Sequence, residues 1–250
     1  MSGLARKALG YVGATAALLA GWWLLALAVG QPALPGPWSA FSAFFREWPV
    51  IWPHILISAG RVLAAMAIGT VLAVPLGLVL GRSPRADSIA APLIFLTYPI
   101  PKVVFLPVLL VLFGIGNLPK IALIALIVFF QILVTARDAS KAVPEGSVLS
   151  VRSLGATRLD IYRHVIVPAS PPDIFTALRI GTGTAIAVLF LAETTAGSDG
   201  IGYYIGDAWG RIDYPGMFAA IIGMALLGVA LYEALDALEA ATTRWRRAAH

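Results

Sequence analysis

Six long apolar stretches, separated by short polar segments, constrain this chain more than any other feature of its sequence. They lie at about Leu9–Val29, Val62–Leu80, Ile89–Phe113, Ile121–Ala136, Leu178–Ala192 and Met217–Leu235. A helix needs about 20 predominantly apolar residues to cross roughly 30 Å of hydrocarbon. The fourth and fifth stretches are shorter, and we expect their helices to extend into the flanking segments. The pattern predicts an all-α integral membrane protein of about six transmembrane helices.

The composition excludes a soluble globular domain. Hydrophobic residues make up 59% of the chain and charged residues 12%, whereas soluble domains carry about 25% charged residues. The chain has no cysteine, which excludes disulfides and thiolate metal sites. The three histidines, His54, His164 and His250, lack the spacing of a metal site.

Basic residues gather in the segments that are cytoplasmic if the N-terminus is cytoplasmic. They are Arg6, Lys7, Arg82, Arg85, Arg137, Lys141, Arg152, Arg158, Arg163, Arg244, Arg246 and Arg247. The outer loops keep only Arg46, Lys120 and Arg211. This bias predicts that both termini are cytoplasmic, so the net charge of +5 reflects orientation and we expect no nucleic-acid partner. A cleaved signal peptide is the alternative reading of the first stretch, which is longer than the usual signal core.

The segment Gln31–Trp52, between the first two stretches, is rich in proline and tryptophan. Tryptophan favours the membrane–water interface. We expect this outer loop to lie against membrane lipid.

The third stretch contains Pro99-Ile100-Pro101-Lys102 near its middle. Proline kinks a helix, and broken backbone within a membrane is tolerated only beside protein or a water-filled cavity. Because intramembrane charges are costly, Pro99, Pro101 and Lys102 are candidates for a solute pathway. Alternatively, Lys102 lies shallower and extends to the outer interface.

The longest polar segment, Arg137–Ala177, predicts two short helices that meet at a corner, the first of them over Arg137–Leu154. Gly155 is suited to a left-handed helix stop, and Thr157 with Asp160 forms a capping box for the next helix. We expect that second helix to end before Pro168. The arrangement indicates a docking element, and a solvated loop is the alternative.

The segment Thr194–Gly216 is rich in glycine and follows Glu193, an acid near the outer end of the fifth stretch. We expect the segment to fold back into the membrane mouth or to move as a gate, with its aspartates Asp199, Asp207 and Asp213 solvated or part of that gate. The chain contains no Gly-x-x-x-x-Gly-Lys-Ser/Thr phosphate loop.

The stretch Val151–Pro168 resembles the cytoplasmic signature loop of permease subunits of bacterial binding-protein-dependent ABC importers. That signature reads Glu-Ala-Ala, three residues, Gly, nine residues, then Ile-x-Leu-Pro. Gly155, Val165, Val167 and Pro168 fit it, whereas Leu149-Ser150-Val151 stands where Glu-Ala-Ala is usual.

Further motifs are similar to the nitrate, sulfonate and taurine permease branch. They are Pro99-Ile100-Pro101, Leu106-Pro107, Phe113-Gly114-Ile115-Gly116, Ala192-Glu193 and Gly200-Ile201-Gly202-Tyr203. The resemblance covers residues 55–240. It implies a single transmembrane permease domain over 1–250, with the first span and outer loop in 1–54 and a permease core in 55–240 that contains a cytoplasmic coupling loop at 137–177.

The resemblance also implies the partners and sites of such a permease. A separate ATPase subunit would bind ATP and Mg, and this chain would bind no cofactor. A second permease subunit (a homodimer is the simpler expectation) and an external solute-binding protein would complete a complex in the bacterial inner membrane. The implied ATPase-coupling residues are Ser150, Arg152, Leu154, Gly155, Ala156, Thr157, Arg158, Asp160, Tyr162, Arg163 and Pro168. The implied pathway residues are Pro99, Pro101, Lys102 and Glu193, and the implied outer-gate residues are Gly200, Gly202 and Tyr203.

The solute implied by this branch is a small anion or zwitterion such as nitrate, a sulfonate or taurine. A secondary transporter driven by an ion gradient is the alternative function. Such folds often contain internal repeats, and the single long cytoplasmic loop has no counterpart in the other half of the chain. A membrane-embedded enzyme is disfavoured because the sequence lacks Gly-x-Ser-x-Gly and His-Glu-x-x-His motifs.

Overall fold

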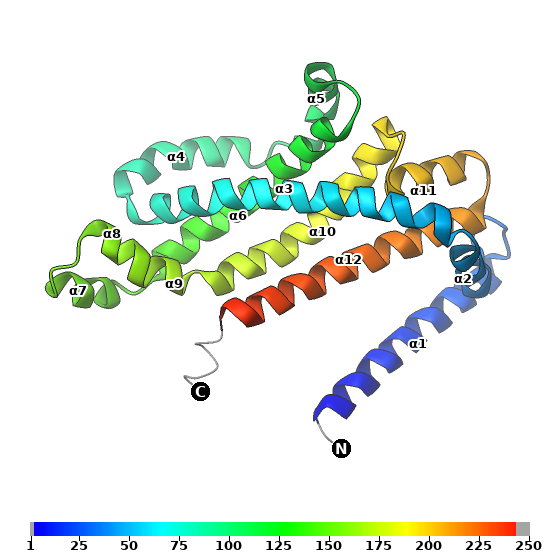
Figure 1. Cartoon of the computed structure of the whole chain (residues 1–250), viewed down its shortest axis with the longest axis horizontal. Helices are drawn as coiled ribbons and strands as arrows, with labels where there is room; N and C mark the ends of the chain where they lie inside the picture. The colour runs from blue at the N-terminus through cyan, green and yellow to red at the C-terminus, as the bar shows by residue number, and fades with distance from the viewer. Residues whose placement is uncertain (1–2, 244–250) are drawn as a thin grey trace.

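The computed structural model describes the backbone of residues 3–243 and the side chains of residues 12–243. The side chains of Arg6 and Lys7, and the whole of Arg244, Arg246, Arg247 and His250, lie outside this description. Every regular element within 3–243 is helical (Figure 1). In chain order the elements are α1 (Gly3–Val29), α2 (Pro37–Arg46), α3 (Trp48–Arg82), α4 (Pro84–Thr97), η1 (Lys102–Phe105), α5 (Leu106–Phe113), α6 (Asn117–Ala142), α7 (Glu145–Ser153), α8 (Arg158–Ile161), η2 (Tyr162–Ile166), α9 (Val167–Ala169), α10 (Pro171–Ala196), α11 (Ile201–Gly210) and α12 (Tyr214–Thr242).

Five of these helices, α1, α3, α6, α10 and α12, are long and apolar enough to cross a membrane, and a bent pair of shorter helices makes a sixth candidate span. The prediction of about six spans is therefore confirmed. The expected lengthening of the fourth and fifth stretches is also confirmed, because α6 and α10 have 26 residues each. The second span begins at Trp48, well before the apolar run, and its first turns bury Ile51 and Ile55.

The third stretch is not one kinked helix, as its sequence suggested. The axis bends by 82° between α4 and the segment Lys102–Phe113. Pro99 and Pro101 together cause this break, because each lacks a backbone N–H and each restricts the residue before it. The helix consequently stops at Thr97 and restarts in a new direction.

The helices α3, α6, α10 and α12 run side by side and form the centre of the molecule (Figure 1). Their contacts bury a shared apolar core that includes Val62, Ala65, Val128, Ile132, Ala185 and Leu189. Glycines let α3 approach α6 closely, since a Cβ on Gly77 would lie 2.6 Å from the carbonyl oxygen of Leu133, and one on Gly81 would lie 2.6 Å from Cβ of Ser140. Small residues at such crossings are typical of helix packing in membranes.

Helix α1 lies apart from this centre and diverges from it in Figure 1. Its C-terminal half is held by Trp22, whose Nε1 donates to the carbonyl oxygen of Pro35 at 3.0 Å. The Trp22 ring also stacks on Phe218 of α12, with 5.5 Å between ring centroids. No residue between Val12 and Val29 is fully buried within the described chain.

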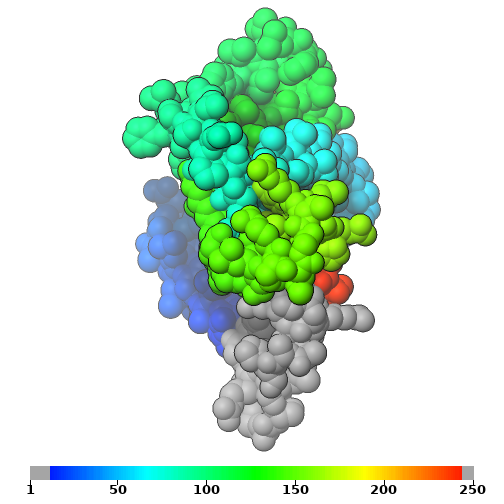
Figure 2. Space-filling view, turned by 90° about the vertical axis from the view of Figure 1, so that its left-hand side faces the viewer, coloured from blue at the N-terminus to red at the C-terminus, as the bar shows by residue number. Residues whose placement is uncertain are grey.

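The segments α7–α9 and α11 lie at opposite ends of the central helices (Figure 1). We refer to these as the Gly155 end and the Gly200 end, after the glycine at each turn. Figure 2 looks onto the Gly155 end, where the segment between α6 and α10 forms the face turned toward the viewer.

Candidate functional site

The corner at Gly155 has the local structure that its sequence predicts. Helix α7 ends at Ser153 with Leu154 as its C-cap, and Gly155 follows in the left-handed region with φ of +87°. Thr157 then caps α8, its Oγ1 accepting from the Asp160 N–H at 3.3 Å while Asp160 Oδ2 accepts from the Thr157 N–H at 2.9 Å. Hydrogen bonds from the Thr157 hydroxyl and N–H hold the pKa of the Asp160 carboxyl below its ordinary value.

The exposed surface of this corner combines apolar and basic side chains. Leu154 at its tip is 86% exposed, and Leu159 on α8 is also largely exposed. Arg152, Arg158 and Arg163 surround them in exposed positions. This surface has the composition of a protein-docking site, because it places large apolar side chains in water with a cationic rim.

The inner face of the corner is fastened to the membrane helices. Val148, Ile161 and Ile166 are buried in a cluster with Leu78 of α3 and Ala136 of α6. A force applied at the corner therefore acts directly on two spans.

Two details of the corner differ from the sequence prediction. Residues 137–154 are not one helix, because α6 ends at Ala142 and Pro144 separates it from α7. The second helix does not end before Pro168, since the π-helical turn η2 carries it into α9. In that wider turn the Val167 N–H donates to the Tyr162 carbonyl. The regular α-helical hydrogen-bond pattern is therefore already interrupted before Pro168, and the missing N–H of Pro168 does not end the helix.

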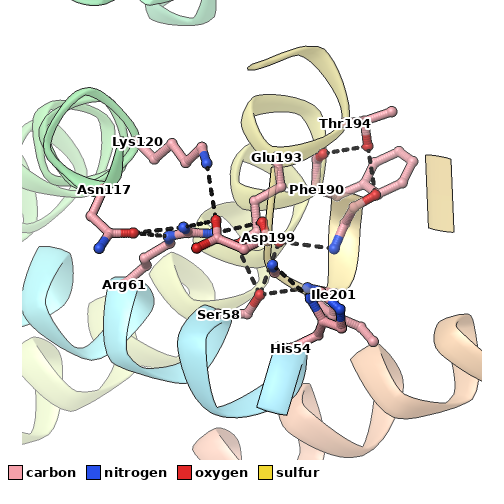
Figure 3. A network of polar contacts seen from close by, with 12 residues as sticks. His54, Ser58, Arg61, Asn117, Lys120, Phe190, Glu193, Thr194, Asp199 and Ile201 are labelled. Atoms are coloured by element: carbon pink, nitrogen blue, oxygen red, sulfur yellow. Dashed lines mark hydrogen bonds and ion pairs between the residues drawn. The ribbon is translucent and has the colours of Figure 1, made fainter. Parts of the chain in front are cut away.

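A buried polar network forms the second site, at the Gly200 end (Figure 3). Its centre is Glu193 of α10, whose side chain is 0% exposed. Glu193 Oε1 accepts from Arg61 Nη1 at 2.6 Å and from Ser58 Oγ at 2.8 Å. Glu193 Oε2 accepts from the Gly202 N–H at 2.8 Å. The Glu193 carboxylate thus accepts hydrogen bonds from two other elements, α3 and α11.

Arg61 of α3 joins this carboxylate to two further elements. Its Nε and Nη2 donate to Asn117 Oδ1 of α6 at 2.8 and 2.6 Å, and Nη2 also donates to the carboxylate of Asp199. Lys120 of α6 is only 1% exposed and places Nζ 3.7 Å from Asp199 Oδ1. The positive charges of Arg61 and Lys120 are thus matched by the negative charges of Glu193 and Asp199, because buried charges must be paired.

Glycine at position 200 lets the chain approach the network. Gly200 has φ of +98°, and a Cβ there would overlap the Glu193 carboxylate and lie 2.6 Å from Arg61 Nη1. The start of α11 then directs its N–H groups inward, with Gly200 donating to His54 Nδ1 at 3.0 Å and Ile201 to Ser58 Oγ at 2.9 Å.

Sequence reasoning found part of this network. It singled out Glu193, Gly200 and Gly202, which the structure brings together, and Tyr203, whose ring lies 6.2 Å from that of His54. It missed the roles of the α3 and α6 members Ser58, Arg61, Asn117 and Lys120. The available signal was their spacing, because Ser58-x-x-Arg61 and Asn117-x-x-Lys120 each place two polar side chains on one helix face.

The placement of Lys120 in an outer loop was wrong, because Lys120 belongs to the first turn of α6. Asp199 is paired with Arg61 and Lys120 while its side chain stays 40% exposed, and its part in a gate stays a prediction. Of the other aspartates, Asp213 caps α12 by accepting from the Gly216 N–H at 3.1 Å. Asp207 pairs with Arg211 at 3.0 Å.

A cavity of about 310 Å³ lies beside the broken third span. Its lining comes from the break, from α6 and from α10: Tyr98, Ile100, Pro101, Lys102, Val103, Ile127, Phe130, Gln131, Thr184 and Val188. The structure thus brings Pro101 and Lys102 to one cavity, whereas Pro99 and Glu193 are not among its lining residues. Glu193 belongs to the polar network instead.

Hydrogen bonds to the backbone hold the Lys102 side chain at the wall of this cavity. Its Nζ donates to the carbonyl oxygens of Thr97 and Tyr98, both at 3.1 Å. The same atom lies 4.5 Å from the centroid of the Phe130 ring, within cation–π range.

Apolar spans, a break beside a cavity and an exposed corner between two spans are features of a helical membrane permease. The model of the family described as "Binding-protein-dependent transport system inner membrane component" matches residues 69–244, and the chain belongs to this family. The chain is 31% identical to the taurine transport system permease protein TauC of Escherichia coli (strain K12), over 97% of this chain and 91% of that protein. It is also 31% identical to the putative aliphatic sulfonates transport permease protein SsuC of the same organism, over 91% and 89%.

Among solved structures, the fold matches a chain of the inward-facing MetNI methionine ABC transporter with a TM-score of 0.65. The match has 21% sequence identity and covers 78% of this chain and 98% of that chain. The resemblance to the ABC importer permeases is thereby confirmed. The chain is an integral inner-membrane transport component, the permease subunit of an ABC importer, rather than an enzyme. Its family implies an ATPase and a solute-binding protein as partners.

Proposed function

We propose that this permease imports a small anion or zwitterion, such as nitrate, a sulfonate or taurine, across the bacterial inner membrane. The named functions of its taurine and sulfonate relatives support this solute class. The cation Lys102 at the cavity wall supports it as well. In this proposal both termini are cytoplasmic, and two copies of the chain form one complex. Residues 1–54 supply the first span and an outer loop at the lipid surface, and residues 55–240 supply the permease core.

The exposed corner at Gly155 is the observation that supports import driven by a separate ATPase subunit. Its tip, Leu154, and its basic rim would dock in a groove of an ATPase subunit, on which ATP and Mg bind. Ser150, Ala156, Thr157, Asp160, Tyr162 and Pro168 would shape and support the same contact. Because the inner face of the corner packs on α3 and α6, closure of an ATPase pair would move these spans as rigid bodies. Nucleotide binding would then supply the free-energy difference between inward-facing and outward-facing states.

The proposed pathway and its outer gate lie toward the Gly200 end. The break at Pro99 and Pro101 would shape the pathway at Lys102. Glu193 would act at the pathway's outer end by holding the start of α11, so that Gly200, Gly202 and Tyr203 form the closed gate. The bonds from Gly202 N–H to Glu193 and from Gly200 N–H to His54 support this assignment.

The test is co-purification of the tagged permease from its own membranes in mild detergent, with its partners identified by mass spectrometry. A Gly155→Arg variant is compared with wild type, since a bulky charge at φ of +87° disrupts the corner. Gly210→Arg is the matched control, because Gly210 lies at the other end of the molecule with open space around it.

We expect an ATPase with a phosphate-binding loop to accompany wild type and Gly210→Arg, and to be depleted with Gly155→Arg. Equal recovery of the ATPase with all three would contradict the placement of the coupling corner. A permease that purifies alone from its native source would contradict the proposed complex. The companion binding protein, once identified, can be screened with nitrate, ethanesulfonate and taurine to test the solute class.

A further inference from the structure

The cavity beside the broken span carries a net positive charge. Of its ten lining residues, Lys102 is the only ionisable side chain other than Tyr98, and none is an acid. The contacts described for Lys102 Nζ are backbone carbonyls and aromatic rings rather than carboxylates. A membrane cavity with an uncompensated ammonium attracts an anion, because the charge is weakly screened there.

A polar pair lines the same cavity as Lys102, in an otherwise largely apolar wall. Gln131 of α6 donates from Nε2 to Thr184 Oγ1 of α10 at 3.1 Å. Gln131 is 14 residues from the start of α6, and so lies near the middle of this 26-residue helix. Its Oε1 has no partner among the described residues but is buried, so a solute would reach it only if the side chain turned. Gln131 and Thr184 are the polar residues on the cavity lining besides Tyr98 and Lys102.

The remaining lining gives the cavity its size and selectivity. Ile127, Phe130 and Val188 supply apolar surface to the lining. A volume of about 310 Å³ is at the small end of the range for ligand pockets. It suits a compact solute with one charged head and a short apolar or polar tail.

We propose that this cavity is a solute subsite for a compact monoanion. Lys102 attracts its charged head, and the Gln131–Thr184 pair contributes polar contacts to the rest of the solute. The break in the third span holds Lys102 at the wall, because the carbonyls of Thr97 and Tyr98 anchor its ammonium group. The assignment rests on the proposed import function and narrows it to a site and a solute charge.

Because this chain has no native cysteine, thiol labelling read on the permease chain of the purified complex reports on an introduced position alone. Val188→Cys introduces a thiol into the cavity wall with little change in volume, and Ser39→Cys places a control thiol at an exposed position of α2, away from the Gly155 corner. Each is reacted with an anionic reagent, sulfonatoethyl methanethiosulfonate, and with its cationic trimethylammonium counterpart. The anionic-to-cationic rate ratio at Val188→Cys, divided by that at Ser39→Cys, reports the potential in the cavity.

We expect this normalised ratio to exceed unity and to fall by roughly tenfold when Lys102→Gln is added. Ethanesulfonate should slow labelling of the Val188→Cys thiol, whereas its neutral isostere ethanesulfonamide should not. Gln131→Leu and Thr184→Val should weaken this protection while leaving the charge preference in place.

Three results would overturn the subsite. A labelling ratio unchanged by Lys102→Gln would show that Lys102 only caps the end of α4 and does not set the potential in the cavity. A thiol that reacts with neither reagent would show a cavity closed to dissolved anions, and equal protection by the sulfonamide would exclude a monoanion site. Because labelling requires no nucleotide, these outcomes are separate from loss of the ATPase, which tests the proposed function.

Discussion

Glu193 and Arg61 show that a buried charge in this protein is paired with an opposite charge and hydrogen-bonded. They are separated by 132 positions in the chain, and their side chains are almost completely buried. Isolated charges in such surroundings are very costly, so each must be matched and hydrogen-bonded. Ser58, Asn117, Asp199 and the Gly202 N–H provide the remaining bonds.

We expect Glu193→Gln to destabilise the permease by about 3–5 kcal/mol, because Arg61 would lose its most buried counter-charge. Asp207→Asn is the control on α11, where removal of an exposed pair should cost less than about 1 kcal/mol. Thermal unfolding in detergent, followed by intrinsic tryptophan fluorescence, measures both. Equal unfolding temperatures for the two variants would show that the network contributes little to stability.

The capping box at Thr157 makes a pH prediction for one residue pair. Because the pKa of Asp160 is lowered in the folded corner, the stabilisation is present above the ordinary carboxyl pKa and is lost as pH falls through the lowered value. The amides of Thr157, Asp160 and Ile161, which are hydrogen-bonded in the corner, should therefore keep their protection at about pH 7 and lose it only below about pH 4. Hydrogen exchange with mass spectrometry, corrected for intrinsic rates, measures this protection. Thr157→Ala should lower it several-fold already at neutral pH, and no change with Thr157→Ala would contradict a role for the cap.

At the scale of elements, the contact between α3 and α6 depends on small residues. Gly77 and Gly81 lie one turn apart on α3, opposite Ala136 and Ser140 of α6. Ala136 and Ser140 are also one turn apart, so both helices present small side chains at the crossing. Lipid supplies no hydrophobic driving force between helices, so the close packing of the two backbones stabilises this crossing.

We expect Gly81→Ala to cost about 1–3 kcal/mol, because its Cβ would lie 2.6 Å from Cβ of Ser140 and force the helices apart. Gly60→Ala on the same helix is the control. Nothing lies within 4 Å of a Cβ at that position, and alanine favours helix, so stability should stay level or rise. Unfolding midpoints in detergent that fall equally for both variants would contradict this account of the crossing.

Elements that depend on neighbours in the chain could be predicted from the sequence, and those that depend on distant neighbours could not. Apolar length predicted the spans, and the Gly155 stop and Thr157 cap followed from residues three or fewer positions apart. The 82° break exceeded the expected kink because two prolines act on one turn. The pairing of Arg61 with Glu193 depends on how α3 and α10 rotate against each other, which no local pattern records.

At the scale of the whole molecule, α6 connects all the sites described. Its first turn carries Asn117 and Lys120 to the polar network, and its middle carries Gln131 to the cavity. Near its end, Arg137 and Lys141 contact Asp87 at the start of α4, with Arg137 Nη2 at 2.9 Å and Lys141 Nζ at 2.7 Å. The corner segment follows directly. We expect movement at the corner to reach the broken span through this Asp87 contact.

Asp87→Asn should loosen α4 from α6, because two cations would then face a neutral amide. We expect faster hydrogen exchange in residues 84–97 with unchanged exchange in α10, together with lower ATP-driven uptake by the reconstituted complex. Asp138→Asn is the control, since Asp138 is 63% exposed and lies 3.8 Å from Arg137 Nη1. If Asp138→Asn affected α4 as much as Asp87→Asn, the contact would have no special role.

The continuity of α6 also limits how its length can change during evolution. One residue inserted between Lys120 and Gln131 would turn the rest of the helix by about 100° and advance it by about 1.5 Å. Gln131 would then leave the cavity, and Arg137 would face away from Asp87. Insertions and deletions among permeases of this type should therefore be found in the connections at residues 30–36 and 143–144, while the spacing from Asn117 to Lys141 stays fixed.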